Sequence, residues 1–265
     1  KRQPFYGKAF LCVDSEHVRS ILPKIKKPFA TYAIEDETAD IYATNVRTNG
    51  AQMQFTAHTR HTGSVHEFDV TLNLPGRHNV LNALASIGVA LECKAPIEAI
   101  QQGLANFAGV GRRFQSYGNI ALPSGGEALI IDDYGHHPVE MASTIAATRG
   151  AYPGRRLVLA FQPHRYTRTK DLFYQFVDIL STADRVVLTE VYAAGEAPIA
   201  DANGHSLANA VRARGLVEPI YCADVQALPQ TLLSILQDGD VVLTMGAGSI
   251  NRVAQALSQL GGQPS

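Results

Sequence analysis

The stretch Asp132–Glu140, with the sequence DDYGHHPVE, gathers groups that can carry charge or hydrogen-bond directly after the apolar run Ala-Leu-Ile-Ile. Pro138 suits the first turn of a helix, where its missing N–H costs nothing. Glu140 in that turn favours the helix dipole. A helix start therefore explains part of the pattern. It does not explain Tyr134 together with two adjacent histidines, and we interpret these side chains as the rim of a binding crevice.

A second stretch, Phe161–Lys170, has the sequence FQPHRYTRTK and lies between an expected strand and an expected helix. It carries His164, Arg165 and Arg168. Arginines in such a loop suit bidentate binding of a carboxylate or phosphate. The alternative is a solvated loop whose arginines pair with surface acids. The density of cationic groups favours the binding role.

The third stretch, Asn73–Ser86, opens an Ala- and Leu-rich helix with a glycine turn. Asn79 and Asn82 are three residues apart and therefore share a helical face. An Asn amide offers a donor and an acceptor together, as the edge of an adenine requires. An Asn cap with one incidental polar residue would give the same pattern, so both interpretations stay open at this point.

Two glycine-containing motifs are less specific. In GVGRRF, Gly109–Phe114, the residues alone indicate a linker with solvated arginines. MGAGSI, Met245–Ile250, is similar to a dinucleotide-binding fingerprint, but Asn251 occupies its third glycine position. We therefore do not expect a hydride-transfer enzyme.

The elements that must position these groups form two halves. Up to about Phe107, strands expected at 41–46, 53–58 and 65–74 suggest an antiparallel meander. Beyond it, strands alternate with helices, which predicts a parallel sheet with right-handed crossovers. Ligands bind at the carboxyl ends of such strands, where the first two stretches lie. The strands expected in the second half are Leu129–Asp132, Leu157–Phe161, Val186–Glu190, Pro219–Cys222 and Val241–Met245.

Composition narrows the class of protein. Of 265 residues, 46% are apolar and 18% charged, so the chain can bury a core. The net charge of −1 shows no excess of basic residues of the kind that nucleic-acid binding requires. No run of residues approaches the ~20 apolar residues of a membrane span. Three scattered cysteines indicate reduced thiols in the cytoplasm. A zinc hydrolase using His136, His137 and His164 is disfavoured, because no metal-ligand spacing is present and no metal ligand is expected.

Taken together, the motifs resemble those of the Mur ligases of peptidoglycan synthesis. LPGRHNVLNALAS, GVGRRF, DDYGHHP, FQPHRYTRT, EVYAAGEAP and GAGSI occur in the family's order over about two thirds of the chain. FQPHRYTRT is similar to the alanine-adding member. The resemblance implies that the lactyl carboxylate of UDP-N-acetylmuramate attacks the γ-phosphate of ATP. The amine of L-alanine then displaces phosphate from the acyl phosphate. Mg²⁺ would accompany ATP.

The resemblance also implies roles for residues, carried over motif by motif. Asn79 and Asn82 would meet the adenine, with His78 beside them. Arg113 would reach the nucleotide phosphates or ribose, and Asp133 would bind the ribose or orient the nucleotide. The catalytic residue itself is not assigned. The residues expected to face L-alanine and the reacting carboxylate or phosphate are Tyr134, His136, His164, Arg165 and Arg168.

By this resemblance the fold is α/β: a Rossmann-like C-terminal ligase domain at 108–265, preceded at 1–107 by the later part of a central ATP-binding domain. A UDP-binding domain, a phosphate loop ending Gly-Lys-Thr and the magnesium ligands are expected in a missing N-terminal part of the same enzyme. We therefore expect the chain to be inactive alone. A non-catalytic nucleotide- or precursor-binding module is the alternative.

Overall fold

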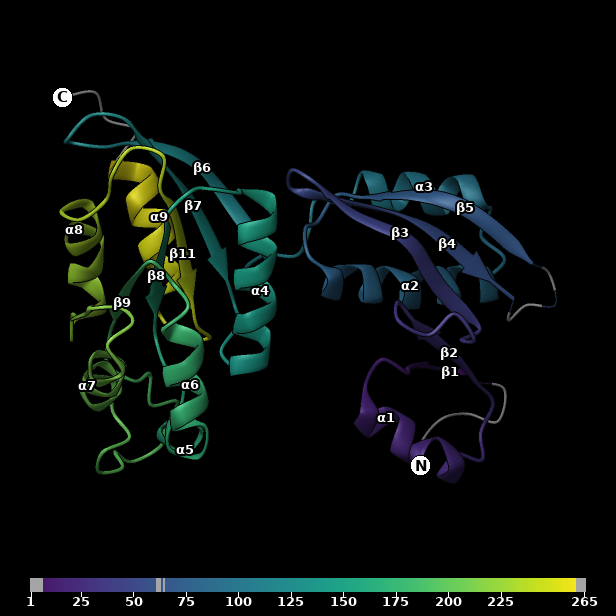
Figure 1. Ribbon diagram of the computed structural model, residues 1–265, viewed down its shortest axis with the longest axis horizontal. Helices are drawn as coiled ribbons and strands as arrows, with labels where there is room; N and C mark the ends of the chain where they lie inside the picture. The colour runs from purple at the N-terminus through teal and green to yellow at the C-terminus, as the bar shows by residue number, and fades with distance from the viewer. Residues whose placement is uncertain (1–6, 61–62, 64, 261–265) are drawn as a thin grey trace. The chain divides into compact units, whose positions relative to one another are not determined.

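The computed structural model describes residues 7–60, 63 and 65–260, and it divides into two compact units, Lys1–Ala108 and Gly109–Ser265. Each unit has its own sheet (Figure 1). Each also has its own hydrophobic core. We describe each unit by itself.

The sheet of the first unit has the order β1-β2-β3-β4-β5. β1, β2 and β3 run parallel, whereas β3, β4 and β5 form the predicted antiparallel meander. The bounds are β1 Ala9–Cys12, β2 Phe29–Ala33, β3 Ile41–Asn49, β4 Gln52–Thr59 and β5 His66–Leu72.

One face of this sheet is covered by α2, Arg77–Glu92, and α3, Ile97–Ala105. The helix α2 approaches closely because Gly88 has no side chain: a Cβ there would lie 2.5 Å from atoms of Ile41 and Phe10. A shorter helix, α1, Glu16–Ile21, follows β1 and continues into a 3-10 turn at Leu22–Lys24. Close packing of α2 fixes the helix that carries the two asparagines.

The sheet of the second unit has the order β10-β9-β8-β11-β7-β6. The five predicted strands are present and parallel. The prediction of a parallel sheet was wrong in one respect, because β6 pairs antiparallel with β7 at the edge of the sheet. Its weak alternation and its register shift between Ser116 and Gly118 explain why no strand was predicted there. The bounds are β6 Gln115–Ala121, β7 Glu127–Asp133, β8 Leu157–Phe161, β9 Arg185–Leu188, β10 Pro219–Tyr221 and β11 Val241–Met245.

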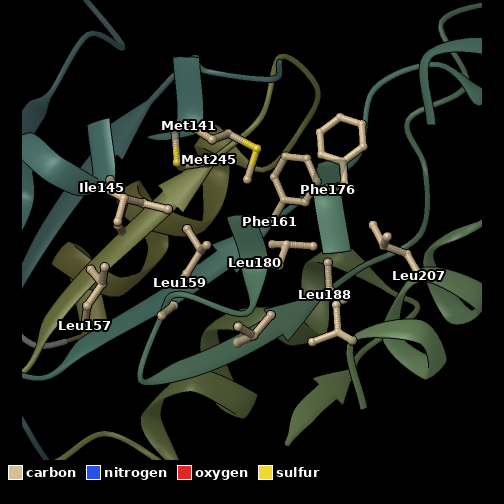
Figure 2. Close-up of a cluster of buried hydrophobic side chains, with 14 of the residues drawn as sticks. Met141, Ile145, Leu157, Leu159, Phe161, Phe176, Leu180, Leu188, Leu207 and Met245 are labelled. Atoms are coloured by element: carbon tan, nitrogen blue, oxygen red, sulfur yellow. The ribbon is translucent and has the colours of Figure 1, made fainter. Parts of the chain in front are cut away.

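Helices cover both faces of this sheet, giving three layers. One core packs α4, α6 and α7 against the sheet through side chains such as Met141, Phe176 and Leu207 (Figure 2). The other core packs α8 and α9 through Leu232 and Val253. The bounds are α4 Pro138–Ala151, α5 Tyr166–Asp171, α6 Phe173–Leu180, α7 Gly204–Arg214, 3-10 turn Val225–Ala227, α8 Leu228–Leu233 and α9 Asn251–Leu260.

The helix expected after the strand β8 is in fact two helices, because α5 ends at Asp171 and α6 begins at Phe173. The three central strands end level with one another: Met245 of β11 pairs with Asp133 of β7 on one side and with Phe161 of β8 on the other. The loops after β7, β8 and β11 therefore leave the sheet side by side.

Candidate functional site at the carboxyl edge of the second sheet

Four rings from three strand ends form a continuous aromatic row, which we call the ring row: Tyr134, His136, His164 and Tyr192. Tyr134 meets His136 edge to face at 5.3 Å between ring centroids, and His136 meets His164 in the same way at 5.6 Å. His164 stacks on Tyr192 at 5.5 Å and 12°. The predicted convergence of the stretches after β7 and β8 is confirmed, since His136 and His164 are in ring contact.

The two adjacent histidines have separate roles. His137 caps α4, with Nδ1 accepting the N–H of Val139 at 3.3 Å, and Pro138 begins the helix as predicted. His136 instead joins the ring row. Its Nδ1 lies 3.1 Å from the carbonyl oxygen of Tyr134, and its backbone N–H donates to Glu140. A carbonyl only accepts, so Nδ1 of His136 carries the proton and Nε2 of the neutral ring is an acceptor.

His164 has the opposite tautomer. Its Nδ1 lies 3.3 Å from Nη1 of Arg168, and a guanidinium only donates. In the neutral ring Nε2 therefore carries the proton. Burial lowers the pKa of His164, and the nearby His136, Arg168 and Arg165 lower it further. The site thus holds one imidazole with an accepting Nε2 beside one with a donating Nε2.

Arg165 and Arg168 are placed differently by the start of α5. Arg165 is exposed at the helix N-cap with φ of 70°, and its backbone N–H donates to the carbonyl of Tyr192 at 2.9 Å. Arg168 is half-buried and also donates to the His164 carbonyl at 3.3 Å. Both guanidinium groups add positive charge beside the ring row.

Asp133 is buried, and it organises the backbone around it. Its Oδ2 accepts the N–H of Phe114 at 2.9 Å, and its Oδ1 accepts that of Gly135 at 2.7 Å. Burial raises the pKa of Asp133, against the opposing effect of these two hydrogen bonds and of Arg113. The predicted contact of this carboxylate with a ribose stays a prediction.

Arg112, just before β6, anchors the base of the site. Its Nε lies 3.1 Å from Oδ2 of Asp132, which has no exposed area, and Thr244 donates to the other oxygen at 2.7 Å. A further N–H of Arg112 donates to the carbonyl of Gly246. Arg112 and Arg113 both lie over the Tyr134 ring, at 4.9 and 5.7 Å from its centroid. The solvated-linker interpretation of GVGRRF is therefore wrong for Arg112, whereas Arg113 is exposed.

The glycine motif after β11 packs against Gln162. A Cβ on Gly246, whose φ is 143°, would lie 2.6 Å from the carbonyl oxygen of Gln162. A Cβ on Gly248 would lie 2.5 Å from Oε1 of Gln162 and 2.7 Å from the Tyr192 ring. The Gln162 side chain also accepts the N–H of Ile250 at 3.0 Å. These glycines are required by close packing.

The first unit carries the other predicted residues at the start of α2. Asn79 donates from Nδ2 to the carbonyl of Pro75 at 2.8 Å, and Asn82 donates to Oδ1 of Asn79 at 3.3 Å. The predicted shared face of Asn79 and Asn82 is confirmed. His78 lies half-buried beside them. Their contact with adenine stays a prediction.

The sequence analysis did not identify Tyr192, which belongs to the ring row, or the contact of Glu140 with His136, which supports the row. Tyr192 follows β9 in the stretch EVYAAGEAP, so its place at a strand end was the available signal. The helix dipole alone does not explain Glu140, because its Oε2 also lies 3.5 Å from Nδ1 of His136.

The described part of the chain holds no cluster of three or more His, Cys, Asp or Glu side chains that could bind a metal ion. No described helix is long and apolar enough to cross a membrane.

Comparison with known proteins identifies the class of protein that has this fold and this site at the carboxyl edge of the second sheet. Residues 112–248 match the family model "Mur ligase, glutamate ligase domain", and residues 1–90 match "Mur ligase middle domain". The chain therefore belongs to the Mur ligase family.

Relatives named UDP-N-acetylmuramate--L-alanine ligase match nearly the whole chain. That of Neisseria gonorrhoeae is 67% identical over 265 residues, and that of Laribacter hongkongensis is 60% identical over 262. In both cases 99% of this chain is matched but only 56% of the relative, so the chain spans about half the length of these relatives. The crystal structure of UDP-N-acetylmuramate-alanine ligase from Thermotoga maritima has a TM-score of 0.70 at 25% identity, covering 87% of this chain and 47% of that one.

Proposed function

We propose that this chain forms part of an ATP-dependent ligase that joins L-alanine to UDP-N-acetylmuramate in the cytoplasm, as a step in peptidoglycan precursor synthesis. The second unit would bind the amino acid. The names of the relatives support the substrates. The observation that carries the proposal is the pair of unlike imidazoles beside two arginines.

An amino acid is a zwitterion, and the ring row offers a partner for each charge. The accepting Nε2 of His136 suits the α-ammonium group. The donating Nε2–H of His164 and the guanidinium of Arg168 suit the α-carboxylate. Burial lowers the pKa of His164, which favours the neutral ring near pH 7, and the contact of Nδ1 with Arg168 favours the tautomer with the proton on Nε2. Tyr134 and exposed Arg165 complete the side of the site that would face the substrates.

The reaction balances without a redox partner. The carboxylate of UDP-N-acetylmuramate attacks the γ-phosphorus of ATP, the bond to ADP breaks, and an acyl phosphate forms. The L-alanine amine, after losing a proton, attacks the acyl carbon, and inorganic phosphate leaves. Such a reaction depends mostly on positioning and on neutralising charge. His136, as an acceptor near the ammonium, could take the proton that the amine loses.

The nucleotide would be held by the residues predicted for it: Asn79 and Asn82 at the adenine with His78 beside them, and Arg113 and Asp133 at the phosphates or ribose. Mg²⁺ would accompany ATP and neutralise phosphate charge. Among the described residues, no cluster of three or more His, Cys, Asp or Glu side chains could hold that ion.

The test is a graft. This chain replaces the matching segment of the Neisseria gonorrhoeae ligase, with which it shares 67% identity. The expected product of the graft is UDP-N-acetylmuramoyl-L-alanine, detected by mass, with phosphate release that depends on L-alanine. This chain alone is expected to give neither. A graft that folds and binds ATP but forms no product would support the non-catalytic binding module instead.

A further inference from the structure

Tyr192 is the member of the ring row for which neither the motif comparison nor the proposed reaction supplies a role. Its ring lies nearly parallel to His164, with 12° between planes and 5.5 Å between centroids. Offset stacking of this kind is a favourable geometry for two aromatic rings. One face of the His164 imidazole is therefore covered by Tyr192.

The backbone of Tyr192 is fixed on both sides. Its N–H donates to the carbonyl of Pro163 at 2.8 Å, and its carbonyl accepts the N–H of Arg165 at 2.9 Å. These bonds form an isolated parallel bridge between His164 and Tyr192, beyond the ends of β8 and β9. The ring that stacks on His164 thus starts from a backbone that is tied to the segment carrying His164.

The surroundings of Tyr192 are fixed as well. Glu190, two residues earlier, accepts the N–H groups of Val191 at 2.8 Å and Gly204 at 3.2 Å, and the Tyr221 hydroxyl at 2.6 Å. From the other side, Gly248 comes so close that a Cβ would lie 2.7 Å from the Tyr192 ring. Gly248 therefore lies against one side of the ring, while 42% of Tyr192 stays exposed.

We propose that Tyr192 is a positioning residue: by stacking, it holds the His164 ring in the orientation that His164 presents to His136 and Arg168, and Gly248 makes room for it. This inference deepens the proposed function, because His164 is where we place the amino-acid carboxylate. Tyr192 itself need not touch the substrate.

The test measures His164 directly in this chain, with no substrate present. Histidine labelled with ¹⁵N reports the tautomer and the titration midpoint of His164 by NMR. The charged and titratable groups facing that ring are His136, Arg165, Arg168 and Glu196. Tyr192→Ala hydrates one ring face, so the midpoint should rise towards that of an exposed imidazole. The Nε2–H tautomer should also give way to a mixture.

Three controls keep the test sharp. Tyr192→Phe keeps the ring and should restore both the midpoint and the tautomer. Tyr174→Ala removes an aromatic ring that is 81% exposed on α6 and should change neither. Unchanged amide signals of β8 and β11 show that the fold persists. A Tyr192→Ala chain that is folded and has an unaltered His164 midpoint and tautomer would overturn the proposal.

The grafted ligase separates this inference from the proposed function. There, Tyr192→Ala should raise the KM for L-alanine about tenfold while leaving the KM for ATP within about twofold, with Tyr192→Phe close to the parent. If the graft makes no product at all, the proposed function fails while the NMR result still decides the role of Tyr192. An altered His164 with an unchanged KM for L-alanine would confine Tyr192 to a structural role and overturn its positioning role.

Discussion

The two units hold their candidate residues in different ways. In the first unit, Asn79 and Asn82 are arranged by one turn of α2, with bonds to Pro75 and to each other. In the second unit, the ring row depends on loops from three strands that are far apart in sequence. The first arrangement is local, so it should form whenever the helix forms. The second is tertiary, so its geometry depends on the packing beneath it.

That difference predicts that the largest effects of mutation will be found under the ring row. Asp132→Ala removes a buried carboxylate that accepts from both Arg112 and Thr244. We expect the free energy of unfolding of the second unit to fall by about 3 kcal/mol, the scale for breaking a buried ion pair. Urea denaturation followed by amide signals of the second unit measures this.

Asp178→Ala is the matched control, because it breaks a surface pair with Arg214 in which both side chains are about half exposed. It should cost less than about 1 kcal/mol. Equal losses in the two variants would show that the Arg112–Asp132 pair is no more important than a surface contact.

Gly246→Ala should have the next largest effect. Its φ of 143° disfavours a side chain, and a Cβ would lie 2.6 Å from a backbone oxygen that cannot easily move. We expect a loss of about 2 kcal/mol in the second unit. Gly195 also has a positive φ, 86°, but an added Cβ there would have nothing within 4 Å. Gly195→Ala should therefore lower the free energy of unfolding by only about 1 kcal/mol. If thermal unfolding shows the same loss of stability for Gly246→Ala and Gly195→Ala, the close packing at Gly246 does not contribute to stability.

Much of this architecture could be predicted from the sequence. The apolar strands of the second sheet and the meander of the first were marked by clear periodicity. The convergence of His136 and His164 followed from the rule that ligands meet at the ends of parallel strands. The strand β6 could not be predicted, because only Ile120 among its residues is buried. The stack of Tyr192 on His164 depends on distances between loops, which no local pattern encodes.

A smaller effect concerns pH. Burial raises the pKa of Asp133 above its ordinary 3.8, so the folded unit holds this proton more tightly than the unfolded chain does. The stabilising contribution is full below that ordinary value and is lost as pH rises through the folded pKa. Asp133→Asn should remove this part of the slope, so its free energy of unfolding, from urea titrations at successive pH values, should vary less with pH than that of the parent. A mutant curve parallel to the parent's would contradict it.

The smallest change in stability is expected for Asn79→Ala, below about 1 kcal/mol, because its bonds are local and partly exposed. Its effect on nucleotide should be larger: calorimetry should find weak ATP binding by this chain and at least about tenfold weaker binding by the variant. Asn209→Ala, an exposed asparagine on α7, is the control and should bind ATP like the parent. Equal binding by all three would remove Asn79 from the adenine site.

The most direct test of the central claim, that the ring row of the second unit binds the amino acid, is a kinetic comparison in the grafted ligase. Arg168→Gln keeps a donor but removes the charge that we place at the carboxylate of L-alanine. The KM for L-alanine should rise about tenfold or more, the scale of one charge-assisted hydrogen bond, while the KM for ATP stays within about twofold. A variant in which the KM for ATP rises and that for L-alanine does not would assign this edge to the nucleotide and contradict the account.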